Sequence, residues 1–360
     1  MLRPARTVGK MRNIPQLSQK RIYPVTEPQA GFPRALARGF RHRRRRGHGM
    51  GYAVVLGEAL IDLLEAERGG ELIYRQAIGG APLNVAVAVA RLGGRVEYAG
   101  TLGTDVLGDR IAAFLAEAGV GAAGVRRVAV PTTLAVTTFQ GAEPAFTFYG
   151  EPPSYALLTA DDLDPATLAG GDLLYTGSIC LLREPFRTAA RRAWADFTGL
   201  RVFDPNVRPK LLPDAAAVTA LRDLVEEFFA TADLVKLSSA DVELLYGDAD
   251  VAAAARRIRA LGAGAVVVTC GARGAHIAAA GDAVLVPAPV VAAVDATGAG
   301  DSVMGALVSR LLAEGRPADA AGWRRQVRFA LAVAALVCER PGGATAMPTP
   351  AEVTARWGEL

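Results

Sequence analysis

The stretch DATGAGD, residues 295–301, places Asp301 directly after Gly298, Ala299 and Gly300, and an apolar run follows it. Residues 303, 304, 306, 307, 308, 311 and 312 are apolar around the whole circumference of a helix, which predicts a buried helix that starts at this turn. The first turn of a helix offers free N–H groups and the positive end of the helix dipole. Because small residues let a phosphate approach this backbone closely, we expect an anion-binding site here.

Asp301 itself has two interpretations. A carboxylate at a helix start can cap the free N–H groups, or it can take the proton from a hydroxyl that attacks a phosphate. Taken alone, the segment favours the cap, because short motifs recur by chance. The choice therefore depends on the residues that the fold brings to this helix start.

The segments from residue 50 onward alternate between strand and helix patterns. This alternation predicts an α/β fold, namely a three-layer, doubly wound, mostly parallel sheet with helices on both faces. The strands are expected at 53–56, 96–99, 173–175, 201–203, 234–236 and 265–269, and the helices at 82–92, 109–118, 216–230 and 251–260. Strand-like pieces at 71–78 and 134–149 break the rhythm, and we expect them to form a small separate sheet placed as a lid.

Polar or glycine-rich clusters follow several of these strands. In open α/β sheets, ligands bind at the carboxyl ends of the strands. The clusters are GEALID (57–62), FDPNVRP (203–209), KLSSAD (236–241), TCGARG (269–274) and DATGAGD. Their convergence at one edge predicts a site for a charged, hydroxyl-rich ligand.

Composition excludes several classes of protein. The net charge is +4, but residues 1–49 hold 13 Lys+Arg and one acid, so they carry +12 and the remainder carries 4 − 12 = −8. An acidic body argues against a nucleic-acid partner. Only His276 lies outside the basic segment, which leaves too few histidines for a histidine-based zinc site or a Ser-His-Asp triad. No apolar run approaches a membrane span of about 20 residues.

The three cysteines are scattered through apolar stretches. They show neither a CxxC spacing nor an even framework, so we expect reduced thiols and a cytoplasmic protein. Residues 1–49 are rich in Arg and Pro, with RHRRRR at 41–46, and are poor in Ser. A disordered arm, a targeting presequence and translated sequence upstream of a start at Met50 are the alternatives; we favour the last, or plain disorder. The expected division is thus a basic extension at 1–49 and one domain at 50–360.

The motifs resemble, in order, those of the ribokinase-like (PfkB) carbohydrate kinases. IGGAPLN at 78–84 is similar to the first family signature and DATGAGD to the second, while FDPNVRP, VKLSSADVELL and VVVTCGARGAHI match further blocks. The resemblance covers residues 50–350. It implies a ribokinase-like fold, an ATP-dependent sugar kinase and a small-molecule sugar substrate.

The same resemblance assigns roles to individual residues. Asp301 matches the catalytic base, and the backbone amides of 298–301 match the anion hole, formed by Gly298, Ala299, Gly300 and Asp301. Four residues match the sugar-binding set: Asp62, Gly79, Gly80 and Asn84. Taken alone, Asp62 would be interpreted as a surface acid at a strand end. Gly79 and Gly80 would form a turn and Asn84 a helix cap, roles that are compatible with sugar binding.

The nucleotide side is implied in the same way. Thr269, Gly271 and Gly274 match the block beside the nucleotide phosphates, and Thr297 is placed with them. Ser238 and Asp241 stand where the family has N-x-x-E, which orders Mg²⁺ through water; the shorter aspartate changes the reach by one methylene. ATP and Mg²⁺ are therefore the expected cofactors, and the family also suggests K⁺ near residues 295–300.

Two acceptors fit the resemblance, which is greatest to the fructokinase and 2-keto-3-deoxygluconate kinase branch. A keto-deoxy acid needs a cation for its carboxylate, but Gly150 stands after Phe148 and Tyr149 where that branch places an arginine. Arg208 remains as a substrate-binding cation, unless it forms an ion pair with a helix or with Asp204. We therefore expect fructose, with the keto-deoxy acid as the alternative and a nucleoside kinase or a non-catalytic regulator as remote ones. A homodimer through the lid is also suggested.

Overall fold

The computed structural model describes residues 51–140, 143–247, 250–279 and 281–360. The chain divides into a unit at Met1–His48 and a second unit at Gly49–Leu360. The expectations for the basic extension at 1–49 lie outside the described residues, and the fold is therefore that of the second unit.

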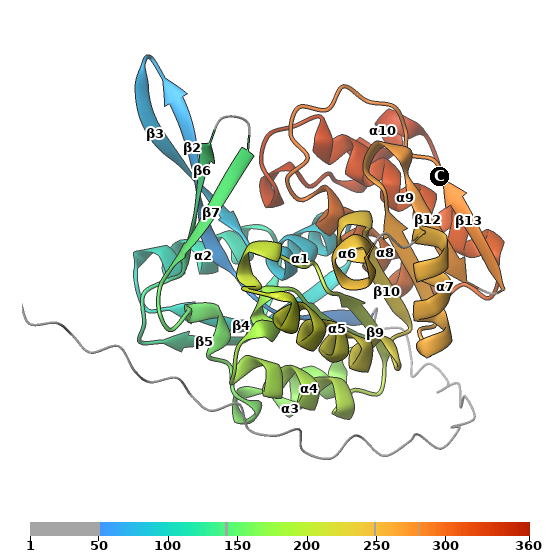
Figure 1. Ribbon diagram of the computed structural model, residues 1–360, viewed down its shortest axis with the longest axis horizontal. Coiled ribbons are helices and arrows are strands. Elements are labelled where there is room, and N and C mark those ends of the chain that lie inside the picture. The colour runs from blue at the N-terminus through green and yellow to red at the C-terminus, as the bar shows by residue number, and fades with distance from the viewer. Residues whose placement is uncertain (1–50, 141–142, 248–249, 280) are drawn as a thin grey trace, which may run out of the picture. The chain divides into compact units, whose positions relative to one another are not determined.

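A large, mostly parallel sheet forms the centre of this unit (Figure 1). Its strand order is β13-β12-β11-β10-β9-β8-β1-β4-β5, and only β12 and β13 run antiparallel to their neighbours. The strands are β1 (Tyr52–Leu56), β4 (Arg95–Gly103), β5 (Gly121–Val128), β8 (Leu173–Gly177), β9 (Leu200–Asp204), β10 (Leu234–Ser238), β11 (Ala265–Thr269), β12 (Ala275–Ala279) and β13 (Asp282–Val286). The expected sheet is confirmed.

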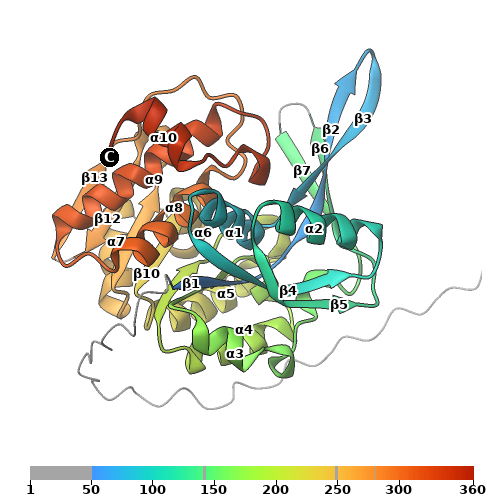
Figure 2. The ribbon, with the colours of Figure 1, turned by 180° about the vertical axis from the view of Figure 1, so that it is seen from behind.

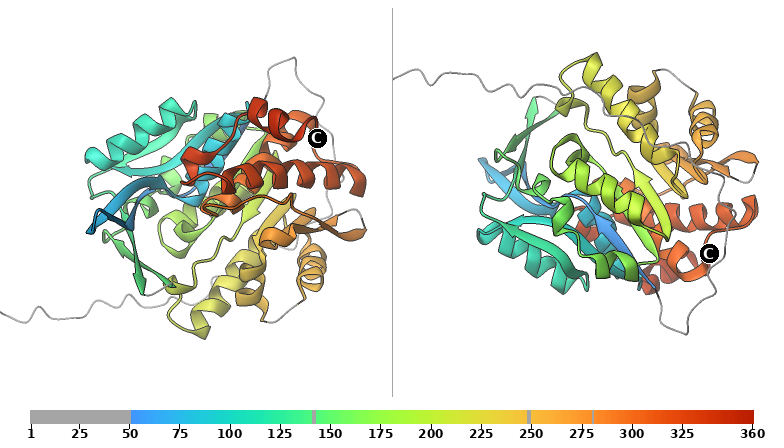
Figure 3. Two further views of the ribbon diagram at one scale, coloured as in Figure 1. Left: turned by 90° about the horizontal axis from the view of Figure 1, so that it is seen from above. Right: turned by 90° about the horizontal axis from the view of Figure 1, so that it is seen from below.

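Helices cover both faces of this sheet (Figure 3). Because successive side chains of a strand point to opposite faces, a run such as AVVL in β1 supplies both cores at once: Ala53 and Val55 enter one, Val54 and Leu56 the other. The first core includes α1 (Ala81–Arg91), α2 (Val106–Glu117), α8 (Ala299–Glu314), α9 (Ala320–Cys338) and α10 (Pro350–Trp357). The second includes α3 (Pro165–Gly170), α4 (Phe186–Asp196), α5 (Ala215–Phe229), α6 (Ser239–Tyr246) and α7 (Val251–Leu261).

Short 3₁₀ turns complete the connections. They are Ser154–Ala156, Ala160–Asp162, Ile179–Leu182, Pro209–Leu211, Gly271–Arg273 and Ala344–Ala346. Helix α2 begins three residues before the expected start, because Asp105 caps it by accepting from the N–H groups of Leu107 and Gly108.

A second, four-stranded sheet stands apart from the first, with the order β3-β2-β6-β7. Its strands are β2 (Leu60–Arg68), β3 (Glu71–Gly79), β6 (Leu134–Gln140) and β7 (Glu143–Tyr149). Figure 2 shows the β2–β3 hairpin projecting from the body. The small sheet is expected from the sequence, but β2 is not, because GEALID reads there as a polar cluster after a strand. LIDLLEAER lacks a clear alternation, since its side chains pass from buried to half-buried to exposed along the strand.

The described helices include none that is long and apolar enough to cross a membrane. The three cysteines are free thiols, with Cys180 and Cys270 buried and Cys338 half-buried.

Candidate active site

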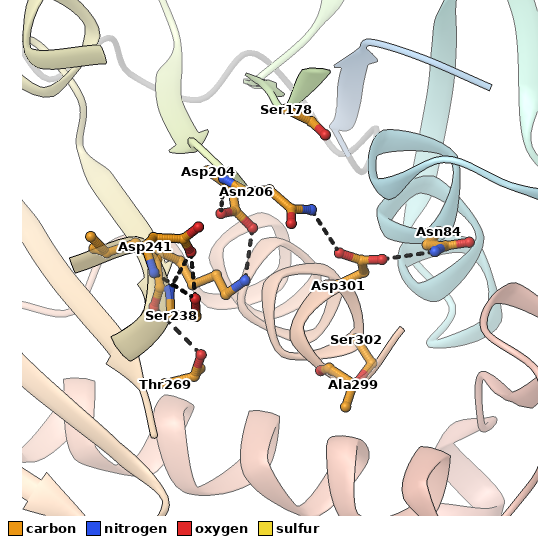
Figure 4. A network of polar contacts seen from close by, with 12 residues as sticks. Asn84, Ser178, Asp204, Asn206, Ser238, Asp241, Thr269, Ala299, Asp301 and Ser302 are labelled. Atoms are coloured by element: carbon orange, nitrogen blue, oxygen red, sulfur yellow. Dashed lines mark hydrogen bonds and ion pairs between the residues drawn. The ribbon is translucent and has the colours of Figure 1, made fainter. Parts of the chain in front are cut away.

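Asp301 lies in the first turn of α8, but it does not cap that helix. The N-cap residue is Gly298, and α8 has no side-chain cap. The Asp301 side chain is 8 % exposed, and its Oδ2 accepts from Asn84 Nδ2 at 2.7 Å while Oδ1 accepts from Asn206 Nδ2 at 3.3 Å. Figure 4 shows the two amides on opposite sides of the carboxylate. The capping interpretation is therefore wrong, and the carboxylate is held for another purpose.

The backbone beside Asp301 presents free donors. Gly298 adopts φ 75°, and a Cβ there would lie 2.9 Å from a backbone carbon, so only glycine fits. The N–H of Ala299 is taken by the carbonyl of Ala296 at 3.1 Å. Within the described chain, the N–H groups of Gly298, Gly300 and Asp301 reach no backbone carbonyl. Three of the four expected donors are therefore free for an anion, two of them from glycine, and the expectation for the Ala299 N–H is wrong because that group is already bonded.

The start of α1 lies across from this turn. A Cβ on Gly79 would meet the Asp62 carboxylate at 2.1 Å, and one on Gly80, at φ 115°, would meet the Glu58 carbonyl at 2.5 Å. The two glycines thus let α1 begin against the β1–β2 segment. Asn84, one turn into α1, is 7 % exposed, and its Oδ1 has no hydrogen-bond partner in the described chain. A buried acceptor without a donor fits a ligand hydroxyl.

Asp62 lies in β2 near the same place. Burial raises the pKa of its carboxyl to about 6, the Arg208 guanidinium opposes this rise, and the charge of Asp301 adds to it. These three charged groups are therefore close enough to interact. The alternative interpretation required an ion pair between Arg208 and Asp204, and the structure has none. Arg208 Nη1 donates instead to the side-chain and backbone oxygens of Asn206.

A buried ion pair lies beside the start of α8. The sequence motifs assign no role to its lysine. Lys236 Nζ lies 2.8 Å from Asp204 Oδ2, with side chains 4 % and 0 % exposed. Burial lowers the pKa of the ammonium, but Asp204 and Asp301 raise it by more, so the lysine stays charged. Its Nζ lies 3.1 Å from the place of a Gly300 Cβ, beside the anion-binding turn. The signal in the sequence is a lysine inside the apolar strand LVKLS.

Ser238 and Asp241 form a capping box at the start of α6. Asp241 Oδ2 accepts from the N–H and the hydroxyl of Ser238, at 2.7 Å each, and Oδ1 accepts from Val207 N–H at 2.8 Å. Asp241 thereby joins α6 to the segment that carries Asn206. No group of three or more metal-ligating His, Cys, Asp or Glu side chains is found in the described residues.

The predicted nucleotide residues lie at neighbouring strand ends. Thr269 pairs with Ser238 in the β10–β11 register. Gly271 and Gly274 follow in a tight turn with positive φ, in which Cys270 N–H donates to Gly274 O at 2.7 Å. Thr297 N–H donates to Asp295 Oδ1 at 2.8 Å, while Asp295 Oδ2 accepts from Gly342 N–H at 3.0 Å. The loop before α8 is therefore tied to the turn after α9.

Comparison with known proteins identifies the family of this chain. The pfkB family carbohydrate kinase pattern matches residues 50–350. Fructokinase-1 of Zea mays is 35 % identical over 317 residues, covering 83 % of this chain and 95 % of its own. Fructokinase from Xylella fastidiosa with bound ATP superposes with a TM-score of 0.77 at 32 % identity, over 84 % of this chain and 97 % of its own.

A second solved structure holds the sugar. Fructokinase from Vibrio cholerae O395 with fructose, ADP and calcium superposes with a TM-score of 0.76 at 30 % identity, over 85 % of this chain and 98 % of its own. The ordered motifs, the ribokinase-like architecture and the family match agree. This chain belongs to the pfkB family of carbohydrate kinases.

Proposed function

We propose that this protein is an ATP-dependent fructokinase that phosphorylates the primary hydroxyl of fructose to give fructose 6-phosphate. One observation carries the proposal. A buried carboxylate, Asp301, stands in the first turn of a helix with free N–H donors, and two amides aim it. This combination supports a role for Asp301 as proton acceptor beside an anion-binding turn, the arrangement that in-line phosphoryl transfer requires.

In the proposed reaction, the sugar oxygen attacks the γ-phosphorus of ATP. A new O–P bond forms, the bond between the γ-phosphorus and the β–γ bridging oxygen breaks, and the hydroxyl proton passes to Asp301. The N–H groups of Gly298, Gly300 and Asp301 stabilise the charge on the transferring group. Lys236 adds a fixed positive charge on the same side.

Mg²⁺ enters this scheme with ATP as its substrate complex. It neutralises phosphate charge and keeps water ligands. Asp241 already accepts three hydrogen bonds, so a contact to Mg²⁺ through water, as predicted, uses its remaining lone pairs while Ser238 holds it in place. Thr269, Gly271, Gly274 and Thr297 line the proposed nucleotide side. K⁺ near the loop before α8 stays a prediction.

On the sugar side, Asp62 and the unpartnered Asn84 Oδ1 supply acceptors for hydroxyl groups. Gly79 and Gly80 allow the sugar to approach the backbone. Arg208 directs Nη1 to oxygens of its own segment, which favours a neutral ketose over a keto-deoxy acid. The similarity to fructokinases supports the same choice.

We further propose that the small sheet closes over the sugar and excludes water, which would otherwise accept the phosphoryl group. Leu72 and Tyr74 on β3 are 65 % and 45 % exposed, and Tyr149 on β7 is 55 % exposed, so this sheet offers apolar surface to a second copy in a homodimer. Phe148 packs towards the second core, while the side chain of Phe146 lies outside the described residues. Light scattering at several protein concentrations tests the dimer.

The activity is tested with purified protein, ATP and Mg²⁺. Fructose, ribose, 2-keto-3-deoxygluconate and adenosine are offered in turn, and ADP is measured. Preferred turnover of fructose supports the proposal, preferred turnover of the keto-deoxy acid reassigns the substrate, and no turnover of any contradicts a kinase role. We expect a protein trimmed of residues 1–49 to keep its rate, and we expect a cytoplasmic location.

A further inference from the structure

Glu58, between β1 and β2, is a buried carboxyl that the proposed mechanism does not use. It is 2 % exposed, and burial raises its pKa. Its Oε1 accepts from Ser178 Oγ at 2.6 Å and from Ala81 N–H at 3.3 Å, and its Oε2 has no partner in the described chain. Burying such a group is costly, so its contacts indicate what it does.

The Ala81 contact replaces a missing helix cap. Ala81 is the first residue of α1, and the N-cap residue, Gly80, has no side chain to satisfy the free N–H groups. Glu58 supplies that acceptor from another segment. Asn84 lies three residues after Ala81, and therefore on the same face of the helix. Holding the first N–H of α1 thus sets where the Asn84 amide lies.

The Ser178 contact connects Glu58 to the other side of the active site. Ser178 follows β8 with φ 70°, a conformation that is uncommon for serine and needs support from its surroundings. A path of hydrogen bonds leads from it around the site and returns to α1, and Figure 4 shows the last part of this path, from Asn206 through Asp301 to Asn84. The members are Glu58, Ser178, Asp204, Asn206, Asp301 and Asn84, with 2.6, 3.1, 3.2, 3.3 and 2.7 Å between successive partners.

We propose that Glu58 is a positioning residue, which holds the start of α1 against the β8 turn and so aims Asn84 at Asp301 and at the sugar. The inference rests on the proposed kinase function. Glu58 reaches neither the nucleotide side nor Asp301 directly. Removal of the Glu58 carboxyl should therefore weaken fructose binding and slow phosphoryl transfer, and it should do so by displacing Asn84.

The test is a double-mutant cycle in fructose phosphorylation. Glu58→Ala should lower kcat/KM for fructose by about 100-fold, the size expected for a displaced reacting group, while KM for ATP changes by less than about threefold. In an Asn84→Ala background, Glu58→Ala should cost less than about threefold, because the group it positions is gone. An equal loss in both backgrounds would overturn the inference.

Matched variants separate positioning from folding. Glu58→Gln keeps an acceptor at Oε1 and should retain kcat/KM within about tenfold of the wild type. Tyr52→Phe removes a hydrogen bond at the opposite end of β1, from Tyr52 Oη to Thr167 O at 2.7 Å, and should leave both KM values unchanged. If Glu58→Ala does not fold, Ser178→Ala takes its place in the cycle.

The two proposals fail differently. An inactive wild type contradicts the proposed function, and the inference with it. An active wild type whose rate survives Glu58→Ala contradicts the inference alone.

Discussion

The replacement Asp301→Asn tests the proposed base most directly, because the structure separates its effect on catalysis from its effect on folding. Each carboxylate oxygen accepts one amide N–H, from Asn84 and from Asn206. In the variant, one oxygen becomes an NH₂ group that faces another NH₂ group. In the sugar-free protein Asn84 can relieve this by a half-turn of its amide, because its Oδ1 has no partner in the described chain to lose.

The two effects differ in magnitude. The hydrogen bonds at stake are worth about 1.5–3 kcal/mol when one partner is charged, and the amide rotation recovers part of this, so the free energy of unfolding should fall by less than about 3 kcal/mol. The loss of the proton acceptor should lower kcat by about 10²- to 10⁴-fold. The replacement should therefore lower kcat far more than it lowers the free energy of unfolding.

The assay measures ADP release at saturating fructose, ATP and Mg²⁺. Urea unfolding and binding of a non-hydrolysable ATP analogue serve as controls. Affinity for the analogue should be unchanged or higher, since one negative charge beside the phosphates is removed. A kcat within about tenfold of the wild type would refute the role as base, and a parallel loss of analogue binding would place Asp301 in nucleotide binding instead.

Three further predictions concern neighbouring residues. Because the pKa of Asp62 is raised to about 6 and its ionised form accepts sugar hydroxyls, kcat/KM for fructose should fall about tenfold per pH unit below pH 6 in a pH–rate profile. Gly298→Ala should lower kcat more than about tenfold in the ADP assay, since φ 75° and a contact at 2.9 Å force the anion-binding turn to shift. Lys236→Met should destabilise the protein by about 3–5 kcal/mol in urea unfolding, because it leaves the Asp204 carboxylate buried and unpaired.

Each has a matched control. In Asp62→Asn, kcat/KM for fructose should no longer fall below pH 6. If it falls as in the wild type, the titrating group is a residue other than Asp62. Gly315→Ala, at a positive φ with nothing near its Cβ position and at the far end of α8, should leave kcat unchanged. Adding Asp204→Asn to Lys236→Met should restore part of the stability; no recovery would mean that the ion pair is not the cause.

Much of the fold is readable from local patterns. Buried strands such as 265–269 and the glycine-rich start of α8 can be predicted, because apolar periodicity and turn residues act over a few neighbours. The strand β2 is not predicted in this way because it belongs to a small sheet that projects from the body. Its side chains need not alternate between a buried and an exposed face, and that alternation is the signal by which a strand is predicted. The helix expected at 109–118 begins earlier in the structure because its cap, Asp105, lies outside the apolar pattern that predicts the helix.

The sequence by itself determined the family and the α/β class, and it predicted an anion-binding turn that carries Asp301. Only the tertiary structure decided which side chains contact Asp301. Its partners, Asn84 and Asn206, lie 217 and 95 residues away along the chain, and the Lys236–Asp204 pair joins two adjacent strands. Such contacts depend on strand order and on where helices start against the sheet, and these are set by packing over the whole domain, which short-range patterns of residue type do not encode.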